Sequence, residues 1–106
     1  MVTTSTLLES AKDHLLARGW TQHRFMRRET GEICLMRALF LASRDLTWPS
    51  RPVYHGVAEC VAVLQSLVNS ASLQDWNDDE TRQPEDVLRL LDVGIEAAEV
   101  QEHFTH

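Results

Sequence analysis

The sequence lacks the features that are typical of enzymes and of membrane proteins. It contains no Gly-rich phosphate loop, no Gly-x-Ser-x-Gly nucleophile elbow and no His-Glu-x-x-His metal motif. No apolar run approaches the ~18 residues that cross a bilayer, and the N-terminus shows no basic segment followed by an apolar one. We therefore expect neither a membrane span nor a secretion signal, and no motif indicates an enzyme.

Basic residues and cysteines are also scarce. Lysine and arginine number 10 against 16 aspartates and glutamates, so the formal net charge is −6. Because such a surface repels phosphate groups, nucleic acid is not expected as a general partner. The two cysteines, Cys34 and Cys60, lie in apolar segments, where a free thiol behaves as a small hydrophobic side chain. A reduced, cytoplasmic protein is therefore the prediction.

Metal-binding side chains do not occur at the spacings that metal sites need. The histidines do not combine with the cysteines at zinc-site spacings, although His103 and His106 lie three residues apart. The acidic segment Asp75–Glu80 lacks the glycine and the distal glutamate of an EF-hand loop. We predict that the protein holds no metal and no cofactor.

What the chain does have is helical periodicity. Its 106 residues, 43% of them hydrophobic, are enough for one domain with its own core. We predict an all-α bundle of four main helices, with an irregular or short hairpin connection between the first two. The predicted helices are Leu7–Arg18, Ile33–Arg44, Pro52–Asn69 and Pro84–Val100, with residues 1–5 and 102–106 as frayed tails.

The run Ile33–Ala42 is apolar almost all round, so we expect the other helices to pack on it. Thr6 and Glu9 have capping-box spacing at the start of the first helix, and Gly19 should end that helix. Ser50 is positioned to cap the third helix. The predicted core consists of Leu15, Trp20, Leu35, Leu39, Val61, Leu64, Trp76, Leu88 and Leu91.

Three segments together resemble a known family. They are Gly19-Trp20-Thr21-Gln22, Cys34-Leu35-Met36-Arg37-Ala38-Leu39, and Leu73–Asp78 followed by Pro84–Leu88. In this order and spacing, the Gly-Trp-x-Gln, Cys-Leu-x-x-Ala-Leu and Trp-Asn-Asp pattern resembles that of small uncharacterised helical proteins of actinobacteria and their phages. The resemblance covers about Leu7 to Ala98. It implies a helical fold and a host range, and it implies no particular activity.

One segment is an exception to the acidic composition. Arg24, Phe25, Met26, Arg27 and Arg28 combine three guanidinium groups with two apolar side chains in the expected loop between the first two helices. Arginine and aromatic residues are enriched at the centres of protein interfaces, so this loop is our candidate binding site. The alternative is that Phe25 and Met26 only hold the loop against the core.

Trp76-Asn77-Asp78 is the most distinctive triplet in the chain. A functional interpretation makes Asn77 and Asp78 a polar ligand pair beside an aromatic ring. The structural interpretation, which we favour, places Trp76 in the core and uses Asn77 or Asp78 to turn or cap the chain. Together with Trp20 and Cys34, we treat these residues as a structural motif. Cys34 as a nucleophile would need a nearby histidine and partial exposure, and its apolar setting indicates an inert thiol.

These observations favour a small protein-binding module. In the setting that the resemblance implies, it would be a phage-encoded or actinobacterial modulator that docks on a host protein. The alternatives are a nucleic-acid-associated regulator that uses the Arg24–Arg28 loop, or a small enzyme with no recognisable motif. The expected partner is another protein, no membrane is involved, and a homodimer is left open.

Overall fold

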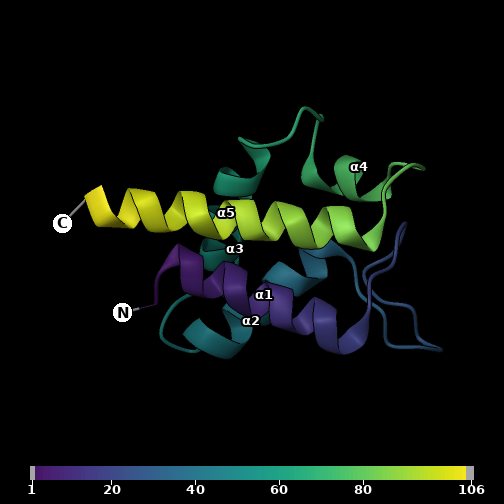
Figure 1. Cartoon of the computed structure of the whole chain (residues 1–106). Coiled ribbons are helices and arrows are strands. Elements are labelled where there is room, and N and C mark those ends of the chain that lie inside the picture. The colour runs from purple at the N-terminus through teal and green to yellow at the C-terminus, as the bar shows by residue number, and fades with distance from the viewer. Residues whose placement is uncertain (1, 105–106) are drawn as a thin grey trace.

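The computed structural model describes residues 2–104, and every regular element within them is helical (Figure 1). The helices are α1 (Thr4–Arg18), α2 (Leu35–Thr47), α3 (Val53–Gln65), α4 (Leu73–Asp78) and α5 (Pro84–Phe104). The predicted all-α class is confirmed, and each of the four predicted helices is present. The short helix α4 was missed, because its segment reads as a polar linker. Met1, Thr105 and His106, which belong to the predicted tails, lie outside the described residues.

The first helix begins three residues earlier than predicted. Thr3, not Thr6, is the N-cap, and its hydroxyl oxygen accepts a hydrogen bond from the Thr6 amide at 3.2 Å. The predicted Thr6–Glu9 capping box is therefore wrong, because Thr6 already lies inside the first turn. Gly19 does end α1, with a φ of 86° that favours glycine, and its amide donates to the Leu15 carbonyl at 2.8 Å.

Residues 4–5 and 102–104 of the predicted tails are helical, and the two tails contact each other. Ser5 in the first turn of α1 donates its amide and its hydroxyl to the carboxylate of Glu102 on α5, at 3.1 and 2.6 Å. The first turn of α1 contains no acidic residue of its own. Glu102 therefore supplies the negative charge that stabilises the positive end of a helix dipole.

The middle helices also differ from the prediction at their ends. Helix α2 begins at Leu35 because Cys34 is its N-cap, with the sulfur accepting from the Arg37 amide at 3.4 Å. Helix α3 is shorter than predicted at both ends. Pro52, not Ser50, occupies its N-cap position, and no side chain caps it. The Leu67 amide donates to the Leu64 carbonyl at 3.0 Å, a tight turn that ends the helix.

Helix α1 lies between α2 and α5, while α3 packs mainly on α2 (Figure 1). Helix α5 packs on α1 and α3, so the expectation that all helices pack on the Ile33–Ala42 run is wrong. The closest approach of α5 to α3 occurs at Gly94, where an added Cβ would lie 2.5 Å from a methyl carbon of Leu64.

The predicted core residues all lie in or against the core. Leu15, Leu35, Leu39, Leu64, Trp76 and Leu91 are buried. Trp20, Val61 and Leu88 are half-buried and pack against the buried cluster. Within residues 2–104, no helix is long and apolar enough to cross a membrane.

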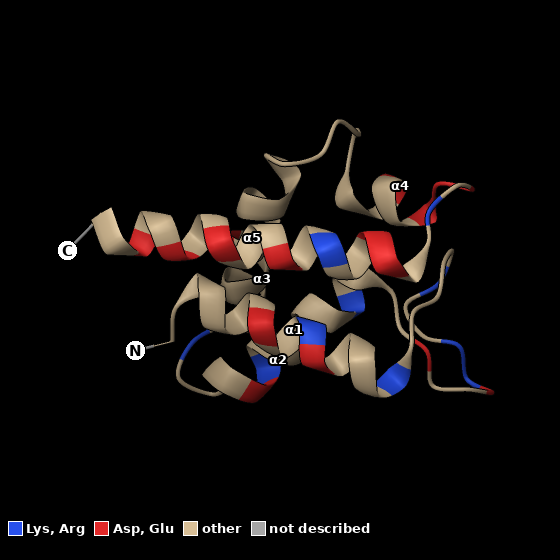
Figure 2. Cartoon of the chain, in the orientation of Figure 1, with Lys and Arg blue, Asp and Glu red and all other residues tan. Residues whose placement is uncertain are grey.

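The connection between α1 and α2 is neither a hairpin of strands nor a free loop. Ile33 forms isolated β-bridges with both Trp20 and Met26, so three passes of backbone lie side by side. The Thr21 amide donates to the Ile33 carbonyl at 2.9 Å, and the Ile33 amide donates to the Gly19 carbonyl at 3.0 Å. These bonds attach both ends of the connection to the bundle, and they leave the segment between them at the surface (Figure 2).

Candidate functional site

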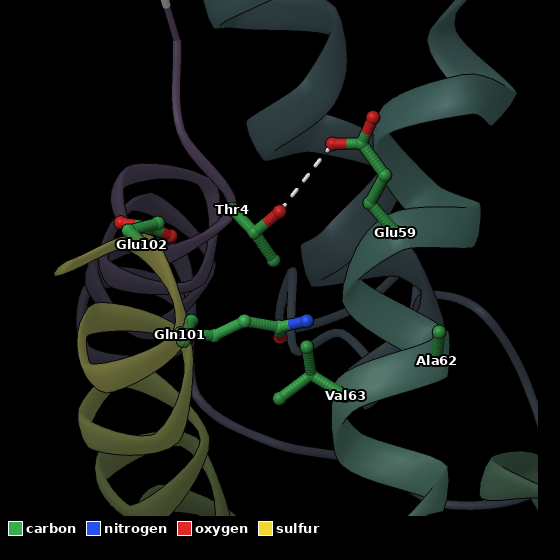
Figure 3. A pocket seen from close by; sticks show the side chains of 7 residues that line it. Thr4, Glu59, Ala62, Val63, Gln101 and Glu102 are labelled. Atoms are coloured by element: carbon green, nitrogen blue, oxygen red, sulfur yellow. Dashed lines mark hydrogen bonds between the residues drawn. The ribbon is translucent and has the colours of Figure 1, made fainter. Parts of the chain in front are cut away.

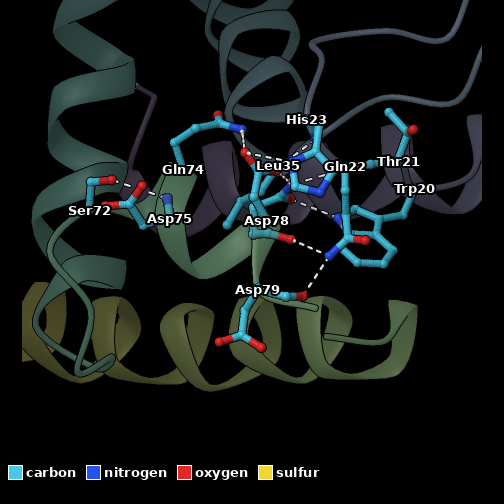
Figure 4. Close-up of polar contacts among 11 residues, drawn as sticks. Trp20, Thr21, Gln22, His23, Leu35, Ser72, Gln74, Asp75, Asp78 and Asp79 are labelled. Carbon is cyan, nitrogen blue, oxygen red and sulfur yellow. Dashed lines mark hydrogen bonds and ion pairs between the residues drawn. The ribbon is translucent and has the colours of Figure 1, made fainter. Parts of the chain in front are cut away.

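A buried polar network holds the α1–α2 connection against α4 (Figure 4). Asn77 is fully buried, and its side-chain oxygen accepts from the Trp20 indole at 2.7 Å and from the Leu35 amide at 3.0 Å. Its side-chain nitrogen donates to the Thr21 carbonyl at 3.3 Å and to an Asp78 oxygen at 2.9 Å. We call this network the Asn77 clasp.

Neighbouring side chains extend the clasp. Gln22 donates to the backbone carbonyls of Asn77 and Asp79, at 3.0 and 2.7 Å. Burial alone would raise the pKa of Asp78, but hydrogen bonds from Gln74, the His23 amide and Asn77 together hold its pKa below the ordinary value. The clasp therefore keeps Asp78 ionised and fixes the backbone up to His23, which has a φ of 65°.

Trp76 packs in the core, and one face of its indole ring contacts a cation. Its side chain is buried, and the Arg82 guanidinium lies 3.9 Å from the centroid of its ring. Arg82 also donates to the Trp76 carbonyl at 2.8 Å. Because Asn77 is fully buried with both side-chain polar atoms occupied, it has none left for a ligand. The three segments that carry the sequence pattern thus meet at one structural junction.

The candidate binding loop begins one residue beyond the clasp. Arg24, Phe25, Met26, Arg27 and Arg28 are all exposed, with Phe25 64% and Met26 41% accessible. The backbone carbonyl of Phe25 accepts from the Cys34 amide at 3.0 Å, and the Arg27 amide donates to the Glu32 carbonyl at 2.8 Å. The loop is therefore anchored by its backbone while its side chains remain available.

The structure adds an apolar groove beside this loop. Two adjoining hollows of about 230 and 430 Å³ share Phe25 and Met36 as lining residues. We call them together the Phe25 groove. The remaining lining residues are Arg37, Phe40 and Val57 in the first hollow, and Val61, Gln65, Ala71, Ser72, Leu73 and Gln74 in the second. Arg37 is the only charged residue among them, and its guanidinium lies 5.3 Å from the Phe40 ring centroid.

Sequence reasoning missed Met36, Phe40, Val57 and Val61 as parts of a surface. Met36 and Phe40 are one helical turn apart on α2, and Val57 and Val61 are one turn apart on α3. We interpreted the run Ile33–Ala42 as apolar almost all round and expected the other helices to cover it. A second apolar stripe on a helix that already has a buried face was the signal that could have revealed the groove.

The cysteines are not placed for catalysis. Both are buried and free, and Cys34 is fully covered at the start of α2. Burial raises the pKa of the Cys34 thiol above its usual value, and it raises that of Cys60 to about 12. A thiol in such a setting is protonated at neutral pH and is a poor nucleophile.

A further hollow of about 360 Å³ lies where α1 begins between α3 and α5 (Figure 3). It contains two carboxylates, and both already have partners. Glu59 pairs with Arg51 at 2.5 Å and accepts from Thr4 at 3.4 Å, while Glu102 binds Ser5. Among the described residues, no three metal-ligating side chains come together here or elsewhere.

Comparison with models of protein families gives a match. A model described as a family of unknown function (DUF6197) matches residues 1–97, which is most of the chain. No curated protein and no solved structure shows significant similarity.

Proposed function

Because the chain belongs to DUF6197, a family of unknown function, we propose a function from the geometry of its surface. The protein is a protein-binding module, and the Phe25 groove is its docking surface. The partner is a short amphipathic helix that has an apolar face and acidic residues along its edges. The observation that supports this is an apolar groove, lined by Arg37 and adjoining a loop with three arginines, on an otherwise acidic protein.

The lining of the groove favours an apolar occupant. Phe25 and Phe40 are 64% and 40% exposed, and they lie with Met36 around one hollow. Exposed aromatic, methionine and arginine side chains are the types enriched at the centres of protein interfaces. These apolar side chains adjoin one another around the hollow instead of being scattered singly. Covering it would remove several apolar side chains from water.

The charge around the groove favours acidic residues at the edges of the occupant. Arg37 lines the groove, and Arg24 and Arg28 from the adjacent loop have no ion-pair partner among residues 2–104. Arg27 is the exception, since its guanidinium lies 3.5 Å from the Glu32 carboxylate. In a chain of net charge −6, this local excess of cations selects for an acidic partner and against a basic one.

A helix suits the groove better than an extended peptide. The described residues contain no strand whose edge an extended segment could join. A hollow between helices instead receives apolar side chains at helical spacing from one face of a partner helix. We further propose a cytoplasmic setting in which this protein is a phage-encoded or actinobacterial modulator and the partner is a host protein, as the motif resemblance implies.

The test uses a displayed library of helical peptides that share an apolar stripe and differ in the charge of the flanking residues. The chain has three methionines, Met1, Met26 and Met36, so ¹³C-methyl labelling gives few signals. Binding in the groove should enrich acidic-flanked peptides and should shift the Met36 methyl signal, because Met36 lines both hollows. Phe40→Glu should abolish this binding.

Leu16→Glu is the matched control, because Leu16 is a 60% exposed apolar residue on α1 that does not line the groove. It should leave binding unchanged. Enrichment of basic-flanked peptides, or binding that Phe40→Glu does not affect, would contradict the proposal. The nucleic-acid alternative is checked by titrating a DNA duplex at several salt concentrations. Binding with a steep salt dependence would favour that alternative over a protein partner.

A further inference from the structure

Helix α5 carries an exposed apolar stripe that no other described helix covers. Val93, Val100 and Phe104 are 45%, 53% and 80% exposed, and Ala97 lies between them, half-buried. Their spacing of four, three and four residues places all four on one side of the helix. In Figure 1, the last turns of α5 extend past the other helices, so this stripe continues beyond the bundle.

One edge of this stripe is acidic. Glu96 and Glu99 are exposed, and the sequence contains no lysine or arginine after Arg89. Figure 2 shows the same contrast, with acidic positions along the second half of α5 and the arginines of the α1–α2 connection at the opposite end of the molecule. The second half of α5 is thus an amphipathic helix with an apolar face and one acidic edge.

This is the chemistry that the Phe25 groove favours. We propose that the groove of one molecule receives the second half of α5 from a second copy of this chain, an inference that rests on the proposed function. Apolar side chains from Val93 to Phe104 would cover Phe25, Met36 and Phe40, while Glu96 or Glu99 would lie near Arg37.

The occupant comes from another molecule because α5 is held away from the groove of its own chain. Helix α5 packs on α1 and α3, and Glu102 ties its last turns to Ser5 at the start of α1. The groove is instead lined by residues of α2, α3, α4 and the connections before α2 and α4, and its lining includes no residue of α5. Because groove and stripe are different surfaces, the contact joins unlike faces. Two molecules form a closed dimer if each inserts its stripe into the groove of the other. They form a ring or an open chain of molecules if each inserts its stripe into the next molecule.

The experiment is sedimentation velocity at increasing concentrations of the full chain and of two charge variants. Phe104→Glu changes the stripe at a residue that is 80% exposed, and Phe40→Glu changes the groove. Each variant should weaken self-association by about tenfold or more, because each puts a charge at the centre of an apolar contact. Leu16→Glu should associate like the unmodified chain, and circular dichroism should show that all three variants remain folded.

Mixing the two variants supplies the decisive result. The Phe104→Glu chain keeps an intact groove and the Phe40→Glu chain keeps an intact stripe, so an equimolar mixture should associate more strongly than either variant alone. The inference would be wrong if Phe104→Glu lost association, Phe40→Glu kept it, and adding Phe40→Glu did not bring the Phe104→Glu chain into the assembly. That pattern would show that the stripe pairs with itself.

The outcome for the proposed function can be read separately. If the unmodified chain stays monomeric at every concentration while acidic-flanked peptides still shift Met36, the groove binds a different protein. The second-copy inference then fails and the proposed function stands. If neither self-association nor peptide binding is observed, both fail.

Discussion

Replacing Asn77 by alanine tests whether one buried side chain holds the α1–α2 connection in place. The substitution removes the acceptor of the Leu35 amide, which is buried at the first position of α2. It also removes the acceptor of the Trp20 indole, 2.7 Å away, and the donor to the Thr21 carbonyl. The Leu35 amide then has no partner, because the Cys34 cap serves the amide of Arg37 instead.

The expected cost follows from these contacts. A buried amide left unsatisfied costs about 1–3 kcal/mol, and each further lost hydrogen bond costs about 1 kcal/mol. Alanine recovers about 0.5 kcal/mol through its higher helix propensity at this position in α4. The net loss is about 3 kcal/mol, against the ~5–15 kcal/mol that stabilises a typical domain. For a chain of this size the melting temperature should fall by roughly 12–20 °C.

Urea denaturation followed by tryptophan fluorescence measures this loss. Asn69→Ala is the matched control, since Asn69 is exposed and forms no side-chain hydrogen bond within residues 2–104. It should cost less than about 0.5 kcal/mol. Trp20→Phe keeps most of the ring and removes one donor, so its cost and that of Asn77→Ala should not add in the double variant. A loss below about 1 kcal/mol for Asn77→Ala would refute the clasp.

Four further outcomes are expected. Leu39→Ala should cost about 2–5 kcal/mol in urea denaturation, because Leu39 is fully buried, and a loss below about half a kilocalorie would mean that α2 is not part of the core. Native labelling of Cys34 and Cys60 with a thiol reagent at pH 8 should be slow until denaturant is added, since both thiols are buried and have raised pKa values. Replacing Arg24, Arg27 and Arg28 together by alanine should abolish binding of acidic-flanked peptides. It should leave the melting temperature nearly unchanged, because exposed charges contribute little to folding. A large fall in melting temperature with peptide binding unimpaired would show that these arginines stabilise the fold. Because the pKa of Asp78 is lowered in the folded chain, its carboxylate should add to the free energy of unfolding at pH values above about 3.9, the pKa of an aspartate in the unfolded chain. This contribution should disappear as the pH falls through the lower pKa of the folded chain. In an acid titration of stability, Asp78→Asn should lack this pH-dependent contribution.

Local sequence signals were sufficient to predict the four long helices and their approximate positions in the chain. The apolar spacing, Gly19 after α1 and Pro84 at the start of α5 are properties of a few neighbouring residues, and these positions were predicted correctly. Helix ends were less predictable because several residues compete to cap them. Thr3 and Thr6 are both good N-caps, and the contact between Ser5 and Glu102 favours the earlier start.

Helix α4 was missed because its six residues show no full apolar period. It is stabilised by contacts with distant segments and by the Ser72 hydroxyl, which accepts from the Asp75 amide at 3.1 Å. A short helix of this kind has little intrinsic stability, so tertiary packing decides whether it forms.

By itself, the sequence determined the helical class and the Arg24–Arg28 segment as the basic exception in an acidic chain. Both depend on composition and on spacing along the chain. Only the tertiary structure decided that Trp20, Leu35 and Asn77 meet in one hydrogen-bond network, and that Phe25 joins Met36, Phe40 and Val57 around a groove. The physical reason is that hydrogen bonds and apolar contacts form between groups that are close in space, whatever their separation in sequence. These residues lie far apart in sequence and become neighbours when the connection folds back onto α2, α3 and α4.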